Sequence, residues 1–284
     1  MKKHLLILPI TLLLAASLAC SFTVNLPSAQ TGETEVLTIQ EAAPANVDTV
    51  ELSIEMGAGE LDIQPGAEVL VEGEMHYNIP DWKPEIVRDG NNLLLRQGRK
   101  DTLTIPGGNV INRWNLKLGS SLPLDLNVDA GAYKGTLNLT GIPLTNLVIQ
   151  DGASQAEVRF DEPNPVKMDS LRYRTGASEV RLIGLGNANP SFFTFEGGTG
   201  SYTLDFTGSL QQDMFADISA GVSNLRIIIP EGMPARVVIS GGLNNIQPRG
   251  TWQISNNVYE TDGSGYKLEI NLNMGLGNLE LVSE

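Results

Sequence analysis

The chain has 284 residues, of which 19 are Lys or Arg and 33 are Asp or Glu, so its formal net charge at pH 7 is −14. A surface this acidic repels phosphate backbones, which excludes nucleic acid as an expected partner, and it has no electrostatic attraction to anionic lipid. One cysteine and two histidines rule out an intramolecular disulfide and argue against a zinc site of the usual Cys and His type. We therefore expect no metal ion and no other cofactor.

Residues 1–20 follow the three-part plan of a secretory signal peptide. Two lysines precede an apolar run over residues 5–14, which is shorter than the roughly 20 residues that a membrane span needs. Small residues follow, and the segment ends in Ser17-Leu18-Ala19-Cys20. This ending resembles a bacterial lipobox, in which the cysteine thiol is acylated and becomes the new N-terminus, but Ser17 stands where an aliphatic residue is usual.

The lipobox resemblance implies that Cys20 is the lipid attachment site. It also implies a membrane-anchored lipoprotein outside the cytoplasm, at the cell surface or in the periplasm. Ordinary cleavage near Cys20 is the alternative. Residues 21–47 are polar and contain Pro27 and Pro44, so they predict a flexible tether between the lipid and the folded body.

Residues 48–100 predict a small N-terminal β domain. Two of its segments, 68–77 and 84–97, have the composition of strands. The run Asp89-Gly90-Asn91-Asn92 predicts a hairpin turn inside the second segment. Gly and Pro over residues 101–112 predict a connector to the rest of the chain.

A glycine motif recurs along the chain, and from Gly131 to Gly242 its copies are 21 to 24 residues apart. The motif glycines are Gly57, Gly131, Gly152, Gly176, Gly198, Gly221, Gly242 and Gly275. The positions three and five residues before each glycine are apolar in every copy, whereas the position two before is always polar. The apolar position four residues after the glycine falters at Gly135, which predicts a bulge or an insertion there.

This alternation predicts that each copy is a strand, a glycine corner and a second strand with one apolar face. Such a unit cannot bury its apolar face alone, so the copies stack and align their apolar columns into one core. We therefore predict an all-β fold, in which a β-solenoid-like stack of about eight short rungs follows an N-terminal β-strand meander. A β-sandwich would also alternate, but it would not keep the same columns at a near-constant period. The corner glycine supplies either a positive φ or room for the backbone of the next rung.

The repeat body is predicted over residues 113–284. If its rungs stack in register, Ile149, Tyr173 and Phe195 lie above one another. Residues 251–265 interrupt the last repeats. Trp252 and Tyr259 in this interruption predict a hairpin that closes the open end, because a stack of strands needs a cap.

Four segments carry a resemblance to a known family: residues 51–61 (ELSIEMGAGEL), residues 71–78 (VEGEMHYN), residues 82–85 (WKPE) and residues 274–281 (MGLGNLEL). The first three resemble the N-terminal domain of the toast-rack family, and the last is similar to the stacked-strand body of that family. The chain is also similar to the soluble domain of bacterial cell-wall-active antibiotic response proteins. The resemblance implies a β-only, solenoid-like fold in the cell envelope, and it supplies no catalytic residue to transfer.

Signatures of catalysis are scarce, so we expect the protein not to be an enzyme. His76 is the only histidine outside the signal, and its alternating strand predicts an outward side chain. The sequence has no Gly-x-Ser-x-Gly elbow and no Cys–His pair. Glu157 and Arg181 occupy equivalent outward positions in successive rungs, which predicts an ion pair across about 5 Å. Arg172 and Arg174 lie on neighbouring outward columns.

Two readings of these charges stay open. An ion pair on a solvated face contributes little, whereas Glu157, Arg172, Arg174 and Arg181 together would form a ligand-binding face. The favoured function is a non-catalytic, lipid-anchored envelope protein that acts as a scaffold, binding or adhesion module, with a role in envelope-stress sensing as a variant. Its partners would be the membrane, through the lipid, and an envelope protein or cell-wall glycan. The alternatives are a carbohydrate-active enzyme of the β-helix type, with acidic residues such as Asp161 near one rung, and self-assembly through an uncapped end.

Overall fold

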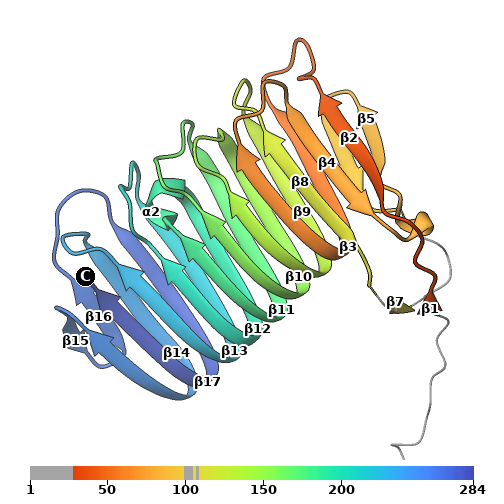
Figure 1. The fold of residues 1–284 in the computed structure, drawn as a ribbon. Coiled ribbons are helices and arrows are strands. Elements are labelled where there is room, and N and C mark those ends of the chain that lie inside the picture. Colours follow the sequence, from red (N-terminus) through yellow and green to blue (C-terminus); the bar gives the residue numbers. More distant parts are fainter. Residues whose placement is uncertain (1–27, 99–104, 107–108) are drawn as a thin grey trace, which may run out of the picture.

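The computed structural model describes residues 28–98, 105–106 and 109–284, and it is built from strands almost throughout (Figure 1). Eight long strands form its body: β3 (Val50–Pro65), β9 (Leu124–Asn138), β10 (Leu144–Arg159), β11 (Met168–Ile183), β12 (Pro190–Asp205), β13 (Met214–Ile229), β14 (Ala235–Arg249) and β17 (Leu268–Ser283). They pair in parallel and contain the eight motif glycines. The predicted all-β, solenoid-like fold is therefore confirmed.

Each long strand bends at its glycine corner, and both halves turn an apolar side to the same interior. In β11, Tyr173 and Thr175 are buried before the corner, whereas Ser178 and Val180 are buried after it. The buried positions thus change from odd to even numbers across the exposed pair Gly176 and Ala177. The bends follow one another along one edge of the stack, and the connecting loops follow the other edge (Figure 1).

The apolar columns align as the repeat predicts. Ile149 in β10 lies opposite Tyr173 in β11, and Tyr173 lies opposite Phe195 in β12. All three side chains are fully buried. The column continues in both directions through Val128 and Ile218, so one dry core runs through the stack.

The corner glycines are required because the rungs approach one another closely. A Cβ atom at Gly152 would lie 2.8 Å from the carbonyl oxygen of Gly131, and one at Gly221 would lie 2.6 Å from that of Gly198. Gly275 repeats this relation with Gly221. Of the two roles predicted for these glycines, room for the neighbouring backbone is therefore the one that operates at these corners, where φ stays outside the left-handed region.

The bulge expected at Gly135 is wrong. Gly135 lies in register between Leu61 of β3 and Ala156 of β10. A Cβ atom at Gly135 would meet the ring of Tyr133, which fills the space of the missing side chain. The irregularity of this pair of strands lies instead at the start of β10, between Leu144 and Asn146.

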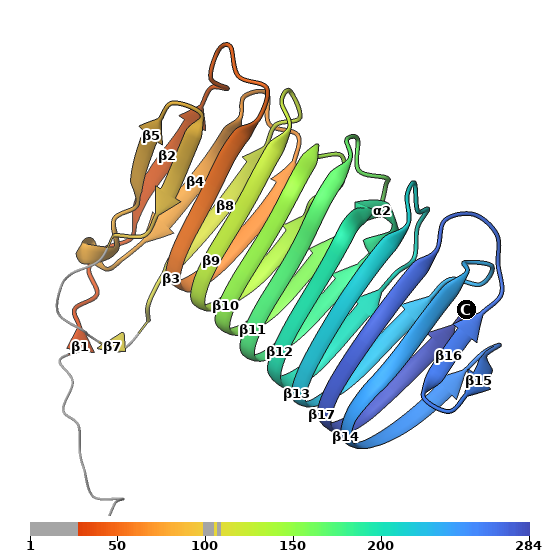
Figure 2. The ribbon, with the colours of Figure 1, turned by 180° about the vertical axis from the view of Figure 1, so that it is seen from behind.

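The last two rungs do not stack in chain order. β17 lies between β13 and β14, so the rung that is latest in the sequence is an inner one (Figure 2). The intervening chain forms β15 (Gln253–Ser255) and β16 (Val258–Thr261), and β16 pairs antiparallel with the first half of β14. The rings of Trp252 and Tyr259 meet edge to face at 6.3 Å, which confirms the predicted closing hairpin.

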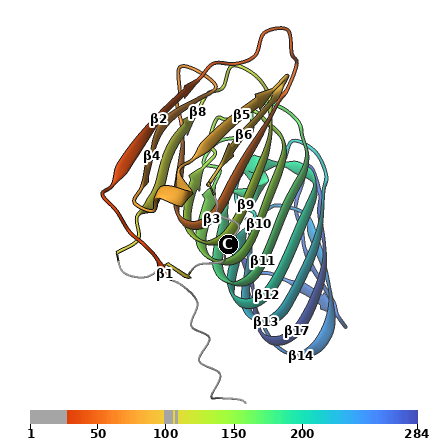
Figure 3. The ribbon, with the colours of Figure 1, turned by 90° about the vertical axis from the view of Figure 1, so that its right-hand side faces the viewer.

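The other end of the stack is covered by short strands, which lie together in Figure 3. These are β2 (Glu35–Glu41), β4 (Val71–Tyr77), β5 (Glu85–Asp89), β6 (Asn92–Arg96) and β8 (Asn112–Leu118). β6 pairs with the first half of β3 and β8 with the second half. β4 then pairs antiparallel with β8, and β2 pairs antiparallel with β4. The predicted turn between the two halves of residues 84–97 is confirmed, with Gly90 at φ 61°.

Two short strands, β1 (Ser28–Ala29) and β7 (Ile105–Pro106), pair with each other. Within residues 28–98 and 109–284, the helical elements are a 3-10 turn, η2 (Pro80–Trp82), and α2 (Leu185–Ala188) among the loops. In the described part of the chain, no helix is long and apolar enough to span a membrane.

Part of the expected tether is a strand instead. Residues 35–41 alternate and bury Ile39 in the core, so they pair with β4 over its whole length. The segment 1–20, with Cys20, lies outside the described residues. The expected division into domains at residues 48–100, 101–112 and 113–284 stays a prediction, while β3 and β9 pair directly across it.

β6 and β8 pair with the two halves of β3 but leave its glycine corner uncovered by any strand. Two amide side chains cover this corner instead. Gln97 Oε1 accepts hydrogen bonds from the backbone N–H of Gly57 at 2.9 Å and from Asn112 Nδ2, also at 2.9 Å. Asn112 Nδ2 also donates to the carbonyl of Ala58 at 2.6 Å, and Asn112 Oδ1 accepts from the buried indole N–H of Trp114 at 2.9 Å. The first corner is therefore closed by hydrogen bonds.

Candidate ligand-binding site

The bend at each glycine gives the stack two outer faces. We call the outward side chains of the strand halves before the corner glycines the front face, and those after the corner glycines the back face. Arg172 and Arg174 of β11 lie on the front face, whereas Glu157 of β10 and Arg181 of β11 lie on the back face. The prediction that these four residues share one face is wrong. The structure separates them because the strand turns at Gly176.

The predicted pairing of Glu157 and Arg181 is confirmed. Arg181 Nε lies 3.7 Å from Glu157 Oε2, and Arg159 Nη2 lies 3.3 Å from Glu157 Oε1. These side chains are between 36% and 56% exposed, and solvent screens such pairs until they contribute about 1 kcal/mol or less. The charges of Glu157, Arg159 and Arg181 are therefore paired but add little to stability.

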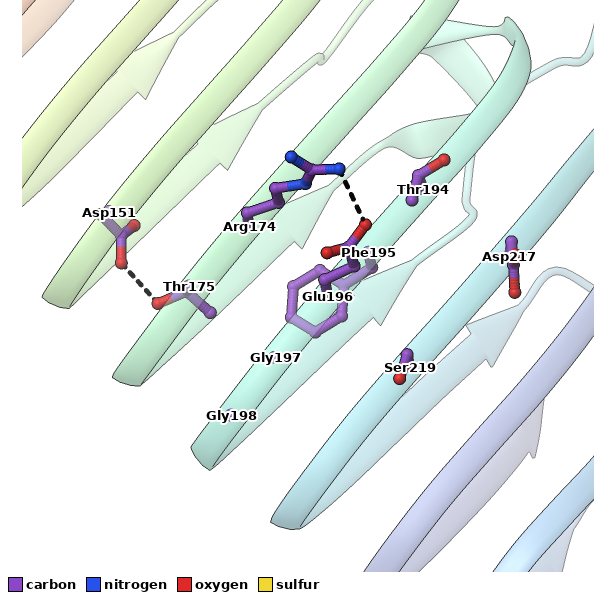
Figure 4. A pocket seen from close by; sticks show the side chains of 10 residues that line it. All are labelled: Asp151, Arg174, Thr175, Thr194, Phe195, Glu196, Gly197, Gly198, Asp217 and Ser219. Carbon is purple, nitrogen blue, oxygen red and sulfur yellow. Dashed lines mark hydrogen bonds and ion pairs between the residues drawn. The ribbon is translucent and has the colours of Figure 1, made fainter.

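The front face holds an open depression of about 480 Å³ near the corners of β11, β12 and β13 (Figure 4). Arg174 and Glu196 form an ion pair at 3.2 Å on its wall. Thr194 and Asp217 lie opposite each other in adjacent rungs along the same wall. Gly197 also lines the depression, and the rings of Tyr202 and Phe195 occupy the space that its side chain would take.

A polar cluster that the repeat pattern did not predict lies buried beneath this depression. Asp151 is 7% exposed, and its carboxyl oxygens accept hydrogen bonds from Tyr173 at 2.7 Å, from Ser178 at 3.2 Å and from Thr175. Burial, with the neighbouring Tyr133 and Asp151, raises the pKa of Tyr173 far above its usual range. The tyrosine hydroxyl therefore stays protonated and serves as a donor.

One feature of the sequence indicates this cluster. Asp151 stands directly before a corner glycine, at a position that is buried in most of the long strands and is Ala130 and Ala220 in two other rungs. A carboxyl group at an inward position demands hydrogen-bond donors. The contacts of this cluster are those of a structural site, because three hydroxyl groups donate hydrogen bonds to the carboxyl oxygens of Asp151.

A second feature of the front face is an exposed aromatic pair. Phe192 of β12 lies opposite Phe215 of β13. Their side chains are 61% and 49% exposed, and their rings are stacked with centroids 6.1 Å apart and an interplanar angle of 25°. They lie two residues before Thr194 and Asp217 on the same strands, so the pair borders the depression.

The remaining candidates offer little chemistry. His76 Nε2 lies 3.1 Å from Glu74 Oε2, and the His76 side chain is 31% exposed on β4. Among the residues that the structure describes, no group of three or more His, Cys, Asp or Glu side chains is placed to hold a metal ion.

These features define a capped, two-sided β-solenoid with charged and aromatic side chains on its outer faces. The family model described as the N-terminal domain of toast_rack, DUF2154, matches residues 27–170, just over half of the chain. The protein therefore belongs to the toast-rack family, as the sequence resemblance implied. No functionally curated protein matches the sequence.

Several solved structures resemble the chain along most of its length. One, described as a candidate cell adhesion protein from Clostridium sporogenes, is 16% identical, with 89% of this chain and 99% of that chain covered and a TM-score of 0.45. A candidate adhesin from Bacteroides fragilis is 11% identical, with 90% and 98% covered and a TM-score of 0.38. A candidate lipid-binding protein from Parabacteroides distasonis is 10% identical, with 88% and 97% covered and a TM-score of 0.37.

Proposed function

We propose that this protein is a non-catalytic, lipid-anchored envelope protein that serves as a rigid scaffold and as a binding or adhesion module. The observation that carries the proposal is the parallel ladder that runs from β3 to β14 with its corners in register. Stacked repeats present extended surfaces to a partner, and short strands cover the stack at both ends. The partner is an envelope protein or a cell-wall glycan.

We propose that the protein is not an enzyme, and this part of the proposal is supported by the hydrogen bonds and ion pairs that its acidic side chains already make. A carbohydrate-active enzyme needs a free acid and base that converge on one bond. In the depression, the carboxyl oxygens of Asp151 accept hydrogen bonds from hydroxyl groups. Arg174 forms an ion pair with Glu196. The competing enzyme function is tested by incubating the purified protein with cell-wall polysaccharides and measuring new reducing ends or unsaturated products. Release above the rate of buffer alone would overturn the non-catalytic role.

The lipid anchor rests on the sequence that ends at Cys20. Full-length protein is expressed in a bacterial host that is fed an alkyne-bearing fatty acid, beside the variant Cys20→Ala. We expect the parent chain to carry the label and to fractionate with the membrane. The variant should do neither. Equal labelling of both chains would remove the anchor from the proposal.

Binding through the outer faces is tested with two matched sets of variants. Arg172→Ala with Arg174→Ala alters the front face, and Glu157→Gln with Arg181→Ala alters the back face. Each immobilised protein is incubated with native envelopes, and the retained material is identified. We expect one set to lose a partner that the other set keeps, whereas equal retention by all three proteins would contradict binding through these faces.

A further inference from the structure

We propose that Phe192 and Phe215, with the adjoining depression on the front face, form a binding site for a neutral glycan chain. This inference rests on the proposed binding function and names the class of ligand. Single exposed apolar side chains are ordinary on protein surfaces. Phe192 and Phe215 differ, because two phenyl rings in register, 61% and 49% exposed, stack against each other and form one exposed aromatic surface, which we call the platform.

The platform is confined to two rungs. The same outward position is Ser170 in β11 and Glu269 in β17, on either side of the pair. A stable protein interface buries about 800 Å² on each partner, which two phenyl rings cannot supply. The platform instead matches the size of one or two sugar rings.

The chemistry of a pyranose fits an aromatic platform with polar groups beside it. One side of a pyranose carries C–H groups, which pack on the electron-rich face of an aromatic ring. Its hydroxyl groups project at the rim and need donors and acceptors. Thr194 and Asp217 follow the two phenylalanines by two residues on the same face, about 7 Å further along each strand, and they line the depression. A glycan on the rings would therefore reach these side chains with its hydroxyl groups.

The local charge favours a neutral glycan over an anionic one. Two positive side chains, Arg172 and Arg174, stand near two negative ones, Glu196 and Asp217, and Arg174 is paired with Glu196. The site thus has no excess of positive charge to attract uronates, sulfates or phosphates. The whole chain has a net charge of −14, which repels polyanions.

The test measures binding of cellohexaose and chitohexaose to the full-length protein in detergent by titration calorimetry, with polygalacturonate as the anionic probe. We expect at least one neutral hexaose to bind and polygalacturonate not to bind. The double variant Phe192→Ala with Phe215→Ala should raise the Kd about tenfold or more, the change that about 1.4 kcal/mol produces. Phe192→Tyr with Phe215→Tyr keeps the rings and should keep the affinity, and Asp217→Ala should raise the Kd severalfold.

Leu276→Ala is the matched control, because Leu276 is also exposed, at 48%, but lies at a corner away from the platform. Three results would overturn the proposal: no neutral hexaose binds, the double variant binds as well as the parent, or polygalacturonate binds more tightly. Light scattering of the same proteins adds a fourth: dissociation of a dimer in the double variant would identify a second copy as the occupant. Cleavage of a bound hexaose would refute the non-catalytic function and leave the platform standing.

Discussion

The carbonyl oxygen of Gly198 lies 2.6 Å from the place that a Cβ atom would take at Gly221. The variant Gly221→Ala therefore forces two rungs apart, and we expect it to lower the free energy of unfolding by about 1–3 kcal/mol, as overpacking does. Gly57→Ala is the matched control, because the equivalent corner of β3 faces only the flexible Gln97 side chain, at 3.4 Å or more. Urea titration followed by circular dichroism measures both; equal losses would contradict the close approach.

Replacement of the buried carboxyl group should be costly. Asp151→Ala leaves the hydroxyl groups of Tyr173, Thr175 and Ser178 without their acceptor, so we expect a loss of about 1–3 kcal/mol. Asp151→Asn keeps one acceptor oxygen and should lose less. Asp217→Ala, at an exposed position of the same surface, should stay within about 0.5 kcal/mol of the parent. A denaturation midpoint of Asp151→Ala that matches the parent would show that these bonds do not stabilise the fold.

Substitutions at Tyr133 and Gly135 should have coupled effects on the free energy of unfolding. Tyr133→Ser removes a buried ring and should cost about 3 kcal/mol or more, and Gly135→Val alone should clash with that ring. The two changes together restore the pattern of other rungs, in which Ser154 or Ser178 accompanies a larger side chain two residues later. A double-mutant cycle of unfolding free energies should give a favourable coupling of about 0.5–3 kcal/mol. Additive losses would contradict the exchange of volume.

Alkaline pH should unfold the protein through its buried tyrosines. Burial raises the pKa of Tyr77 to about 12, and the hydrogen bond that its hydroxyl donates to Glu35 adds to this. An unfolded tyrosine has a pKa near 10, so between pH 10 and 12 the unfolded chain binds fewer protons than the folded one. The stability that Tyr77 contributes is therefore complete below about pH 10 and is lost as the pH rises towards 12.

The variant Tyr77→Phe checks this assignment, since phenylalanine has no proton to lose. Unfolding free energies measured from pH 8 to 12 should fall less steeply for the variant than for the parent. Burial also raises the pKa values of Tyr133, Tyr173 and Tyr202, so the variant should keep part of the slope. Identical slopes would show that Tyr77 does not titrate with unfolding.

Local alternation was enough to predict the core. Ile149, Tyr173 and Phe195 could be aligned because parallel strands with one apolar side have a single register that buries it. The ion pair of Glu157 and Arg181 followed from the same register. The register did not predict that Arg181 and Arg172 lie on different faces. The bend at the corner changes which side of the strand faces outward, and residue type does not reveal the angle of that bend.

Other features depend on volume and on long-range pairing. The exchange between Tyr133 and Gly135 requires knowing that a ring turns into the space of its neighbour, which a column of residue types cannot show. The exposed, stacked pair of Phe192 and Phe215 could not be predicted, because aromatic residues in strands are usually expected to be buried in the core. The position of β17 depends on which edge accepts it after a long connection, and spacing along the chain does not determine that choice.

The insertion of β17 between β13 and β14 has a consequence for synthesis. Six rungs, from β3 to β13, can assemble as they leave the ribosome, but β14 emerges before its inner neighbour exists. The edge of β13 therefore stays open until β17 arrives, because β17 is its partner in the finished stack. A chain cut before β17 would lose an internal layer and leave two unpaired edges, each a template for association with another chain.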